Sequence, residues 1–560
     1  MGLISEIMCN HTYLGKKIDE RFVFLGAFNP YRTMDVKMKE SGLVYYNMKK
    51  KNKLNNLVYT VNPLPHSLLN FIFDFGSLQP EDEKKYIKNT VVSILSKIDE
   101  KLFGKKKKRK DKLFKNFSDE KFEIFSDEMI ESISICHDYI REIYDKSTVS
   151  LREIRRFGIF FEYFMKHFKE ENNYKQMKWS LNMTLYLCYY LRINDKKNRQ
   201  QLVDRLNKFY DDSFLLVPES EIRKITREMD INEKGIALNR TLRENLFTCF
   251  TCIDNNVPII IVGKPGTGKS LSFQILFNTL KGENSKSSLF RDKGILYRYY
   301  YQGSETSTSK GIKKVFKNAL KAKKDPKNRN NINLVFFDEM GLAERSSNNP
   351  LKVIHFLLEM DEENSVPFLG ISNWRLDAAK INRALNLSIT DYDIEDLEET
   401  AISIAEALDQ NLSNKYKEFF RVLAKTYHEY IIFNQNNIKE NKDFHGNRDF
   451  YNLIKTAMRE LIMKTEELNK NENKALTEIG LLSLSRNFGG LENSSTKIKG
   501  IFKNLYKDKY DETVEISKGF SVSDSIKKNV TDPNSRYLML ISEGNDASDI
   551  AKYLLESLGK

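Results

Sequence analysis

The stretch "VGKPGTGKS", residues 262–270, most strongly constrains the fold of this 560-residue chain. Gly263, Gly268, Lys269 and Ser270 satisfy the spacing G-x-x-x-x-G-K-[ST]. Glycines let a backbone curl around phosphate groups, with amide N–H groups aimed inward at the start of a helix. The apolar run "VPIII" precedes the loop, and the helical pattern "KSLSFQILFNTL" ends the unit. The sequence therefore predicts a strand, a phosphate-binding loop and a helix.

The whole loop is expected to bind the phosphates of ATP. Lys269 would reach the β- and γ-phosphates, and the Ser270 hydroxyl would bind Mg²⁺. The expected nucleotide-binding residues of the loop are Gly263, Lys264, Pro265, Gly266, Thr267, Gly268, Lys269 and Ser270.

Two further apolar runs end in polar side chains. In "INLVFFDE", four apolar residues lead directly to Asp338 and Glu339, as expected for a buried parallel strand that ends in two carboxylates. Asp338 would hold the Mg²⁺ shell, and Glu339 would orient and polarise the attacking water. The run "PFLGISNW" ends at Asn373, whose amide is expected at the γ-phosphate or that water. These three parts predict an AAA+ ATPase, an α/β fold with a parallel sheet flanked by helices.

The residues around these elements are more specific than the motifs. "GKPGTGKSLS", "FFDEMGLAERSSNNPLKVIHFLLE", "GISNWRLDAAKINRA" and "DFHGNRDFYNLIK" resemble the AAA+ region of the mysterin family, giant RING-type ubiquitin ligases with a dynein-like motor core. The resemblance covers essentially the whole chain and is strongest over residues 230–490. It implies ATP hydrolysis with ATP and Mg²⁺ as cofactors. The partners that it implies are neighbouring AAA+ modules, the rest of a larger ligase and ubiquitin-pathway proteins.

The same resemblance divides the chain into one complete module between two partial ones, each α/β part followed by a helical lid. The N-terminal stretch resembles the second half of a module, with a strand that ends at Asn29, and "SRYLMLISEGNDASDIAKYLLE" resembles the start of another without G-K-[ST]. The expected divisions are 1–110 (end of a preceding α/β part), 111–230 (helical lid with a basic insertion), 231–400 (complete α/β ATPase part), 401–485 (helical lid) and 486–560 (start of a following module).

Two arginines are candidates for a sensor and a finger. Arg448 in "GNRDF" lies in the expected lid and is a candidate sensor for its own module. Arg383 in "LDAAKINRA" lies where AAA+ modules often carry a finger that reaches a neighbouring site. A surface salt bridge is the alternative for both, because spacing alone does not orient a guanidinium. Since a following module is present only in part, we expect the isolated chain to bind ATP well and hydrolyse it slowly.

The five cysteines exclude a RING on this polypeptide, since a RING needs eight Cys and His ligands at zinc spacing. Ubiquitin transfer is therefore implied by the resemblance alone. Cys249 and Cys252 form a single C-x-x-C, which we interpret as two small core residues on a helix, with a redox or metal pair as the alternative. The aromatic stripe "FGIFFEYFMKHF" is likewise expected in a core, with a base-stacking or lipid surface as the alternative.

The net charge of +13 raises the question of a nucleic-acid partner. The lysines concentrate in runs such as "KKKKRKDK" that are typical of solvated insertions, so we do not expect a dedicated nucleic-acid partner. A nucleic-acid-stimulated ATPase and a non-hydrolysing nucleotide switch or scaffold are kept as alternative functions. No apolar run approaches the roughly 20 residues needed to cross a bilayer, so no transmembrane segment and a cytoplasmic location are expected. The same basic run leaves a nuclear location as the alternative.

Overall fold

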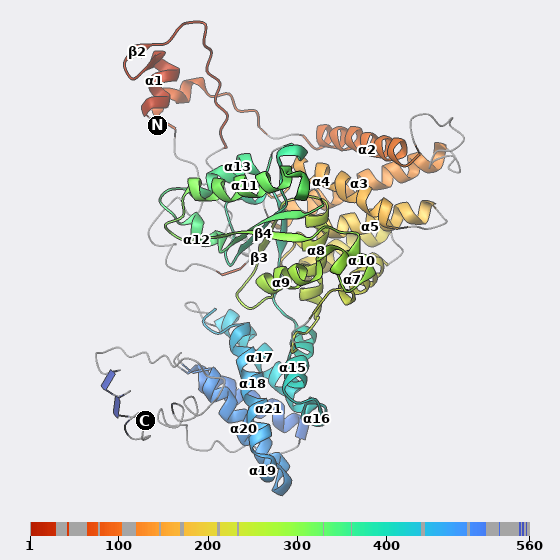
Figure 1. Cartoon of the computed structure of the whole chain (residues 1–560), viewed down its shortest axis with the longest axis vertical. Coiled ribbons are helices and arrows are strands. Elements are labelled where there is room, and N and C mark those ends of the chain that lie inside the picture. Colours follow the sequence, from red (N-terminus) through yellow and green to blue (C-terminus); the bar gives the residue numbers. More distant parts are fainter. Residues whose placement is uncertain are drawn as a thin grey trace. The chain divides into compact units, whose positions relative to one another are not determined.

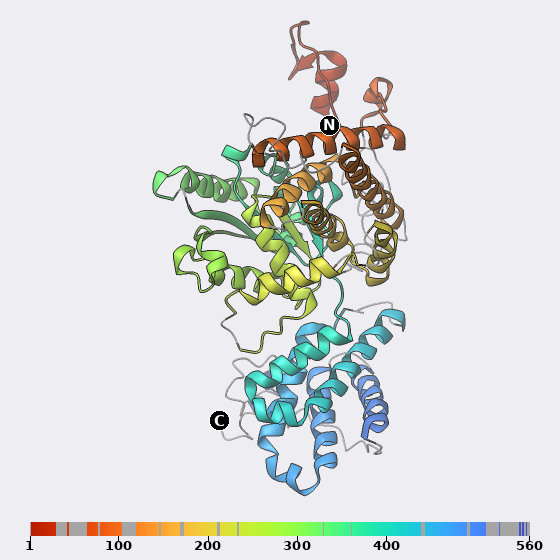
Figure 2. The same cartoon turned by 90° about the vertical axis from the view of Figure 1, so that its right-hand side faces the viewer.

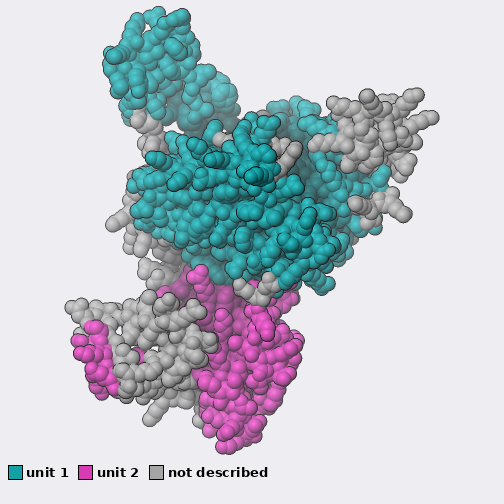
Figure 3. All heavy atoms as spheres, in the orientation of Figure 1, with its two compact units in different colours: residues 1–231, 240–391 teal, residues 232–239, 392–560 magenta. Residues whose placement is uncertain are grey.

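The computed structural model describes most of the chain and divides it into two units, residues 1–231 with 240–391 and residues 232–239 with 392–560 (Figure 3). The described residues are 2–29, 42–43, 64–76, 79–103, 119–144, 147–168, 173–209, 213–231, 234–328, 330–359, 361–437, 443–489 and 493–510, with single positions at 526, 548, 549, 552, 553 and 556.

The first unit contains a five-stranded sheet in the order β4-β5-β6-β3-β7, and every neighbouring pair is parallel. Its strands are β3 (Ile259–Val262), β4 (Leu296–Gln302), β5 (Ile332–Asp338), β6 (Phe368–Ser372) and β7 (Leu385–Ser388). The side chains of β3 are all buried, as expected for a strand covered on both faces. The expected α/β fold with a parallel sheet is confirmed.

Helices cover both faces of this sheet (Figure 1). On one face Ile312 and Phe316 of α11 (Ser309–Lys324) pack in a core with Phe337 of β5. On the other face the ring of Phe273 on α9 (Lys269–Thr279) stacks on Phe336 with centroids 4.1 Å apart. Consecutive residues of β5 thus point to opposite layers, because side chains alternate along a strand. The remaining helices around the sheet are α8 (Arg240–Asp254), α10 (Ser288–Arg291), α12 (Met340–Glu344), α13 (Ile354–Leu357) and α14 (Ala378–Ile381).

Helices from the first half of the chain belong to the same unit, and α2 to α5 pack against one another (Figure 2). They are α2 (Pro80–Phe103), α3 (Asp119–Ile143), α4 (Leu151–His167), α5 (Asn173–Cys188), α6 (Lys196–Leu206) and α7 (Leu216–Arg227), with the 3₁₀ turn η5 (Tyr190–Arg192). Before them lie α1 (Gly2–Asn10), β1 (Thr12–Tyr13), β2 (Lys16–Lys17) and η3 (His66–Phe71). Residues 22–29 have no regular structure, so the expected strand that ends at Asn29 is not formed; no strand pairs with this segment among the described residues.

Buried polar contacts connect these helices to the turn between α14 and β7, and we call residues Glu153, Arg156, Arg192 and Asn382 the junction. Arg156 and Arg192 both donate to Glu153 over 2.9 Å, and Arg192 donates to the side-chain oxygen of Asn382 over 3.1 Å. Burial by itself raises the pKa of Glu153, but the two guanidinium groups outweigh it and hold that pKa at about 2. The carboxylate therefore stays ionised, and its charge is neutralised inside the protein.

The second unit is helical. Its core contains apolar side chains such as Phe419, Phe450 and Phe502. Its helices are α15 (Ile394–Leu408), α16 (Gln410–Lys415), α17 (Lys417–Asn437), α18 (Asn447–Met463), α19 (Thr465–Lys470), α20 (Glu472–Asn487) and α21 (Ser494–Tyr510). The helical core continues through α21, past the expected lid boundary at residue 485.

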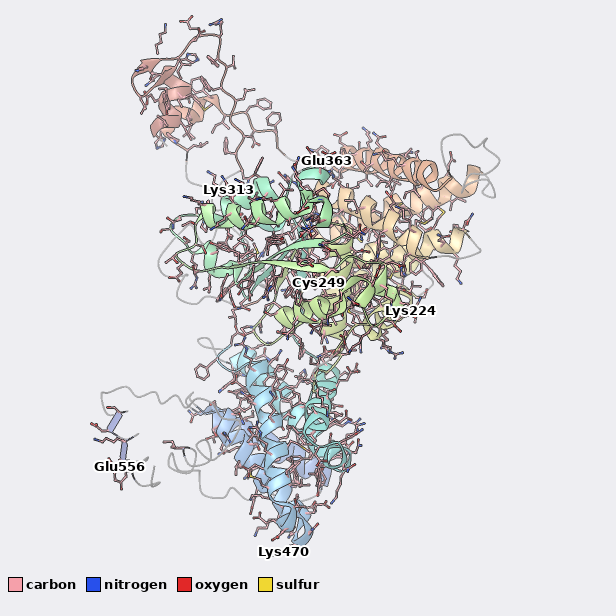
Figure 4. All side chains as sticks on the ribbon, in the orientation of Figure 1. Lys224, Cys249, Lys313, Glu363, Lys470 and Glu556 are labelled. Carbon is pink, nitrogen blue, oxygen red and sulfur yellow. The ribbon has the colours of Figure 1, made fainter. Side chains whose placement is uncertain are left out.

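Other sequence predictions can be compared with the fold. Cys249 and Cys252 are free and buried on α8, so the core interpretation is confirmed (Cys249 is labelled in Figure 4). The stripe on α4 is also core, since Phe157, Phe160 and Phe164 are buried. The run "KKKKRKDK" and most of residues 535–556 lie outside the described residues. Within the part of the chain that the structure describes, no helix is both long enough and apolar enough to span a bilayer.

Candidate nucleotide site

The loop after β3 has the backbone of a phosphate cradle. Gly268 has a φ of 79°, a left-handed conformation that favours glycine, and it caps the start of α9. A Cβ on Gly263 would lie 2.9 Å from the Cβ of Ile389, so no side chain fits there. Asn245 on α8 supports the loop from behind, because its buried amide donates to the Thr267 carbonyl over 3.2 Å. The loop thus holds a fixed curve at the start of a helix, the geometry that binds phosphate.

Lys269 points back into this curve. Its amine is buried and donates to the carbonyl oxygens of Gly263 and Lys264, both over 2.8 Å. Ser270 follows at the exposed start of α9, whereas Lys264 pairs with Asp391 over 3.1 Å. Within one loop, Lys269 therefore faces inward and Lys264 faces a carboxylate beside it.

The two predicted carboxylates lie at the end of β5. The Asp338 carboxylate accepts from the Glu339 amide over 2.9 Å. Glu339 has a φ of 52° in the left-handed region, a conformation that costs a non-glycine residue about 1–2 kcal/mol. Backbone strain of this kind concentrates at functional sites, where it fixes the direction of a side chain.

Asn373 connects the carboxylates to the loop. Its amide donates to both carboxylate oxygens of Glu339, over 3.0 and 3.1 Å. The preceding residue, Ser372, accepts from the Gly263 amide over 3.2 Å. Because β3, β5 and β6 are parallel neighbours, their carboxyl ends share one edge of the sheet, where ligands of open α/β sheets bind.

These residues suit a magnesium nucleotide. The loop offers the Lys269 amine, while the Ser270 hydroxyl and the half-buried Asp338 carboxylate are oxygen ligands of the kind that Mg²⁺ prefers. Protein-bound Mg²⁺ usually needs one or two carboxylates, with phosphate and water completing its shell. The described residues contain no cluster of three or more His, Cys, Asp or Glu side chains able to hold a metal without such help.

The motifs did not indicate several neighbours of this site. Leu43 donates its amide to the Asn373 carbonyl over 2.8 Å, so a segment far upstream lies on the same strand end. Arg345 lies over the ring of Trp374, 5.4 Å from its centroid. Burial and the nearby Asp338 carboxylate raise the pKa of Tyr300, which keeps its phenol protonated. The polar neighbours Asn245 and Tyr300 carry no motif of their own, so only the fold reveals them.

Arg383 lies away from this edge. It precedes β7, at the amino end of the strands, whereas the loop follows the carboxyl end of β3. Its guanidinium pairs with Glu359 and donates to the His355 carbonyl over 3.3 Å. In this arrangement Arg383 makes the salt bridge that was the alternative to a finger, and it does not reach the loop of its own module.

Arg448 lies in the second unit, in the first turn of α18. Its side chain is exposed, and the neighbouring Asp449 accepts from the Gly446 amide over 2.8 Å at the start of the helix. Exposure leaves the guanidinium accessible to an anionic partner.

Comparison with known proteins gives one family and several relatives. The family described as "RNF213 AAA domain" matches residues 235–396, which include the loop, both carboxylates and Asn373. E3 ubiquitin-protein ligase RNF213 of Homo sapiens is 29% identical over 500 residues, which cover 81% of this chain and 9% of that protein. E3 ubiquitin-protein ligase rnf213-beta of Danio rerio and RNF213 of Mus musculus are each 28% identical over 98% of this chain and 11% of those proteins.

The chain spans about a tenth of the length of these relatives. The matched residues coincide with the parallel sheet and with the cradle that follows β3. Residues 235–396 are therefore similar to the RNF213 AAA domain, and most of the chain resembles an AAA+ segment of the RNF213, or mysterin, ligases.

Proposed function

We propose that this chain binds and hydrolyses ATP as an AAA+ motor segment of a mysterin-like ubiquitin ligase and couples the nucleotide to conformational change. The observation that carries the proposal is the contact of Asn373 with both carboxylate oxygens of Glu339, at the edge where the phosphate loop begins. Asn373 thus fixes the direction of the Glu339 carboxylate close to the phosphate loop. A carboxylate fixed in this way can position a water molecule for attack on a phosphate.

In this proposal the loop binds the phosphates of ATP, and Glu339 activates the attacking water. The Lys269 amine exchanges its two carbonyl partners for the β- and γ-phosphate oxygens. Ser270 and Asp338 would hold Mg²⁺, which would supply positive charge where negative charge develops on the phosphate. A Glu339 carboxylate oxygen accepts the proton of the attacking water, and Asn373 fixes the direction of that carboxylate.

Fast turnover needs an arginine finger, and Arg383 does not reach the loop of its own module. An arginine finger raises phosphoryl-transfer rates by about 10³–10⁵-fold, and Arg383 pairs with Glu359 away from the loop. We propose that another module supplies the finger, and that Arg383 in turn serves a neighbouring site after release from Glu359. Arg448 is proposed as the lid sensor. Association with ubiquitin-pathway proteins and a cytoplasmic location, with a nuclear one as the alternative, belong to the same proposal.

Equilibrium ATP binding tests the first part of the proposal. Calorimetric titration would compare the unchanged chain with Lys269→Ala and with Lys264→Ala, a matched lysine in the same loop that faces Asp391. Loss of the inward charge should weaken binding at least about tenfold, since hydrogen bonds to charged groups contribute about 1.5–3 kcal/mol. Lys264→Ala should change affinity only slightly. Equal affinities for all three proteins would overturn the assignment.

A further inference from the structure

A pocket lined by both apolar and polar side chains lies in the first unit, beside the end of β3 from which the phosphate loop starts. The space that it shares with the solvent at its open mouth is about 470 Å³ in all, and it lies where η5 and the end of α3 meet α14 and β7. Its lining includes Thr148, Arg192, Arg375, Asn382 and Asn386. Val262, the last residue of β3, also lines it, whereas loop residues 263–270 and the two carboxylates of the candidate nucleotide site do not.

Three buried polar atoms of the lining have no hydrogen-bond partner within the described part of the chain. They are the Arg192 Nε, the Thr148 Oγ1 and the Asn386 Oδ1. Arg192 is only 2% exposed, so its N–H cannot turn to bulk water. A buried polar group without a partner costs about 1–3 kcal/mol, and such groups in a native protein usually meet a water, an ion or a ligand.

The charge of the lining favours an anion. Arg156 and Arg192 share the same Glu153 oxygen, so these three ionised side chains carry one net positive charge. Arg375 adds a second guanidinium to the lining. A guanidinium is planar and always charged, and its donors match the spacing of oxygen atoms in phosphate and carboxylate.

The three unpartnered atoms narrow the class of anion. The Arg192 Nε is a donor, the Thr148 hydroxyl can donate, and the Asn386 Oδ1 only accepts. A bound group must therefore present anionic oxygens and also one O–H donor. Hydrogen phosphate does so at neutral pH, because it retains a proton. Sulfate has the same shape and charge without that proton.

We propose that this pocket is a binding site for inorganic hydrogen phosphate, separate from the phosphate loop. Two anionic oxygens accept from Arg192 and Thr148, and the P–OH group donates to Asn386. The site joins the helices of residues 119–231 to the sheet, so bound phosphate would stabilise that contact. A phosphate monoester, whose second pKa is near 6, has lost most of this proton at pH 8 and should bind less well.

Equilibrium dialysis with radiolabelled inorganic phosphate tests the site. The chain would carry Lys269→Ala, so that the phosphate loop contributes less to binding. We expect saturable binding of about one phosphate per chain at pH 8, with sulfate and methyl phosphate competing at least about tenfold less well. Methyl phosphate that competes more strongly than phosphate would overturn the choice of inorganic phosphate. Absence of saturable binding, as for a pocket that holds only water, would overturn the site. Equal competition by sulfate would overturn the assigned P–OH contact with Asn386 and with it the choice of hydrogen phosphate.

Two variants test the assigned atoms. Asn386→Asp places a carboxylate against the anion and should reduce binding more than about tenfold, while Thr148→Val removes one donor and should reduce it several-fold. Asn284→Asp, at an exposed asparagine, adds the same charge elsewhere as the control. Circular dichroism and thermal melting would establish that each variant is folded. If Asn386→Asp does not fold, the phosphate binding of Thr148→Val is the test of the site. Unchanged binding in the folded variants would contradict the proposal.

Discussion

Two clusters of charged side chains in the first unit differ in burial and in the groups that they contact. One is the candidate nucleotide site at the carboxyl end of the strands, which we call the nucleotide edge, and the other is the junction. At the nucleotide edge, Ser270 is exposed and Glu339 is half-buried, and Lys269 contacts loop carbonyl groups that a phosphate can replace. At the junction, Glu153 is 1% exposed and fixed by two arginines. Charged side chains that remain accessible can thus bind a ligand. Charged side chains that are buried and paired with each other instead connect parts of the fold.

Removal of the junction carboxylate is the strongest test of this comparison. Glu153→Ala leaves the guanidiniums of Arg156 and Arg192 buried without their counter-charge, so we expect a loss of about 3–5 kcal/mol in the free energy of unfolding. Glu359→Ala, at a carboxylate that is 43% exposed, should cost about 1 kcal/mol or less. Urea unfolding measures both, and similar losses would show that burial does not distinguish the junction.

Acid should weaken the junction through the same carboxylate. The pKa of Glu153 is lowered from 4.5 to about 2, so its contribution to stability is present above about pH 4.5 and is lost as the pH falls towards 2. Each unit of pH in that window corresponds to about 1.4 kcal/mol for a full proton. The difference in unfolding free energy between the unchanged chain and Glu153→Gln should therefore narrow on acidification. A difference that stays constant from pH 7 to pH 2.5 would refute this assignment.

At the nucleotide edge, the support of Glu339 should affect turnover more than folding. Asn373→Ala removes the amide that contacts both carboxylate oxygens, and we expect ATP turnover to fall about 10²-fold, the order of loss that accompanies misplaced reacting groups. The unfolding free energy should change by about 1 kcal/mol. Asn364→Ala, at an exposed asparagine, is the control for steady-state turnover. Turnover equal to that of the unchanged chain would remove Asn373 from the mechanism.

A smaller effect is expected behind the loop. Asn245→Ala leaves the Thr267 carbonyl without the amide that it accepts from, so ATP affinity should fall several-fold, equivalent to about 1 kcal/mol. Titration with ATP at constant Mg²⁺ measures the change. An affinity loss as large as that of Lys269→Ala would mean that the conformation of the loop depends on α8 more strongly than the single hydrogen bond from Asn245 suggests.

The position of the motif residues at one edge of the sheet could be predicted from the sequence, because strand periodicity and parallel topology bring them together. Once Gly263, Asp338 and Asn373 are each placed after a strand, a parallel sheet puts them at one edge. Apolar spacing also predicted that residues 111–230 are helical, and the described part of that segment contains the helices α3 to α7. These predictions use local patterns, which a single sequence contains.

The junction and the supports of the loop could not be predicted in this way. Arg192 and Asn382 are 190 positions apart, and a chain with 90 basic and 77 acidic residues offers many other pairings. Asn245 has no motif, and its role depends on how α8 packs behind the loop. The direction of Arg383 towards Glu359 likewise depends on the turn before β7. Contacts of this kind follow from tertiary packing and not from spacing.

Turnover by Glu339→Gln tests the central claim most directly. ATP binding and phosphate release would be measured on the same preparations of the unchanged chain, Glu339→Gln and the exposed control Glu283→Gln. The account predicts slow release by the unchanged chain and the control, and release by Glu339→Gln about 10²–10⁴-fold slower, with ATP affinity retained. Equal release by all three proteins, or no release by any of them despite ATP binding, would contradict hydrolysis at this site and favour a nucleotide switch.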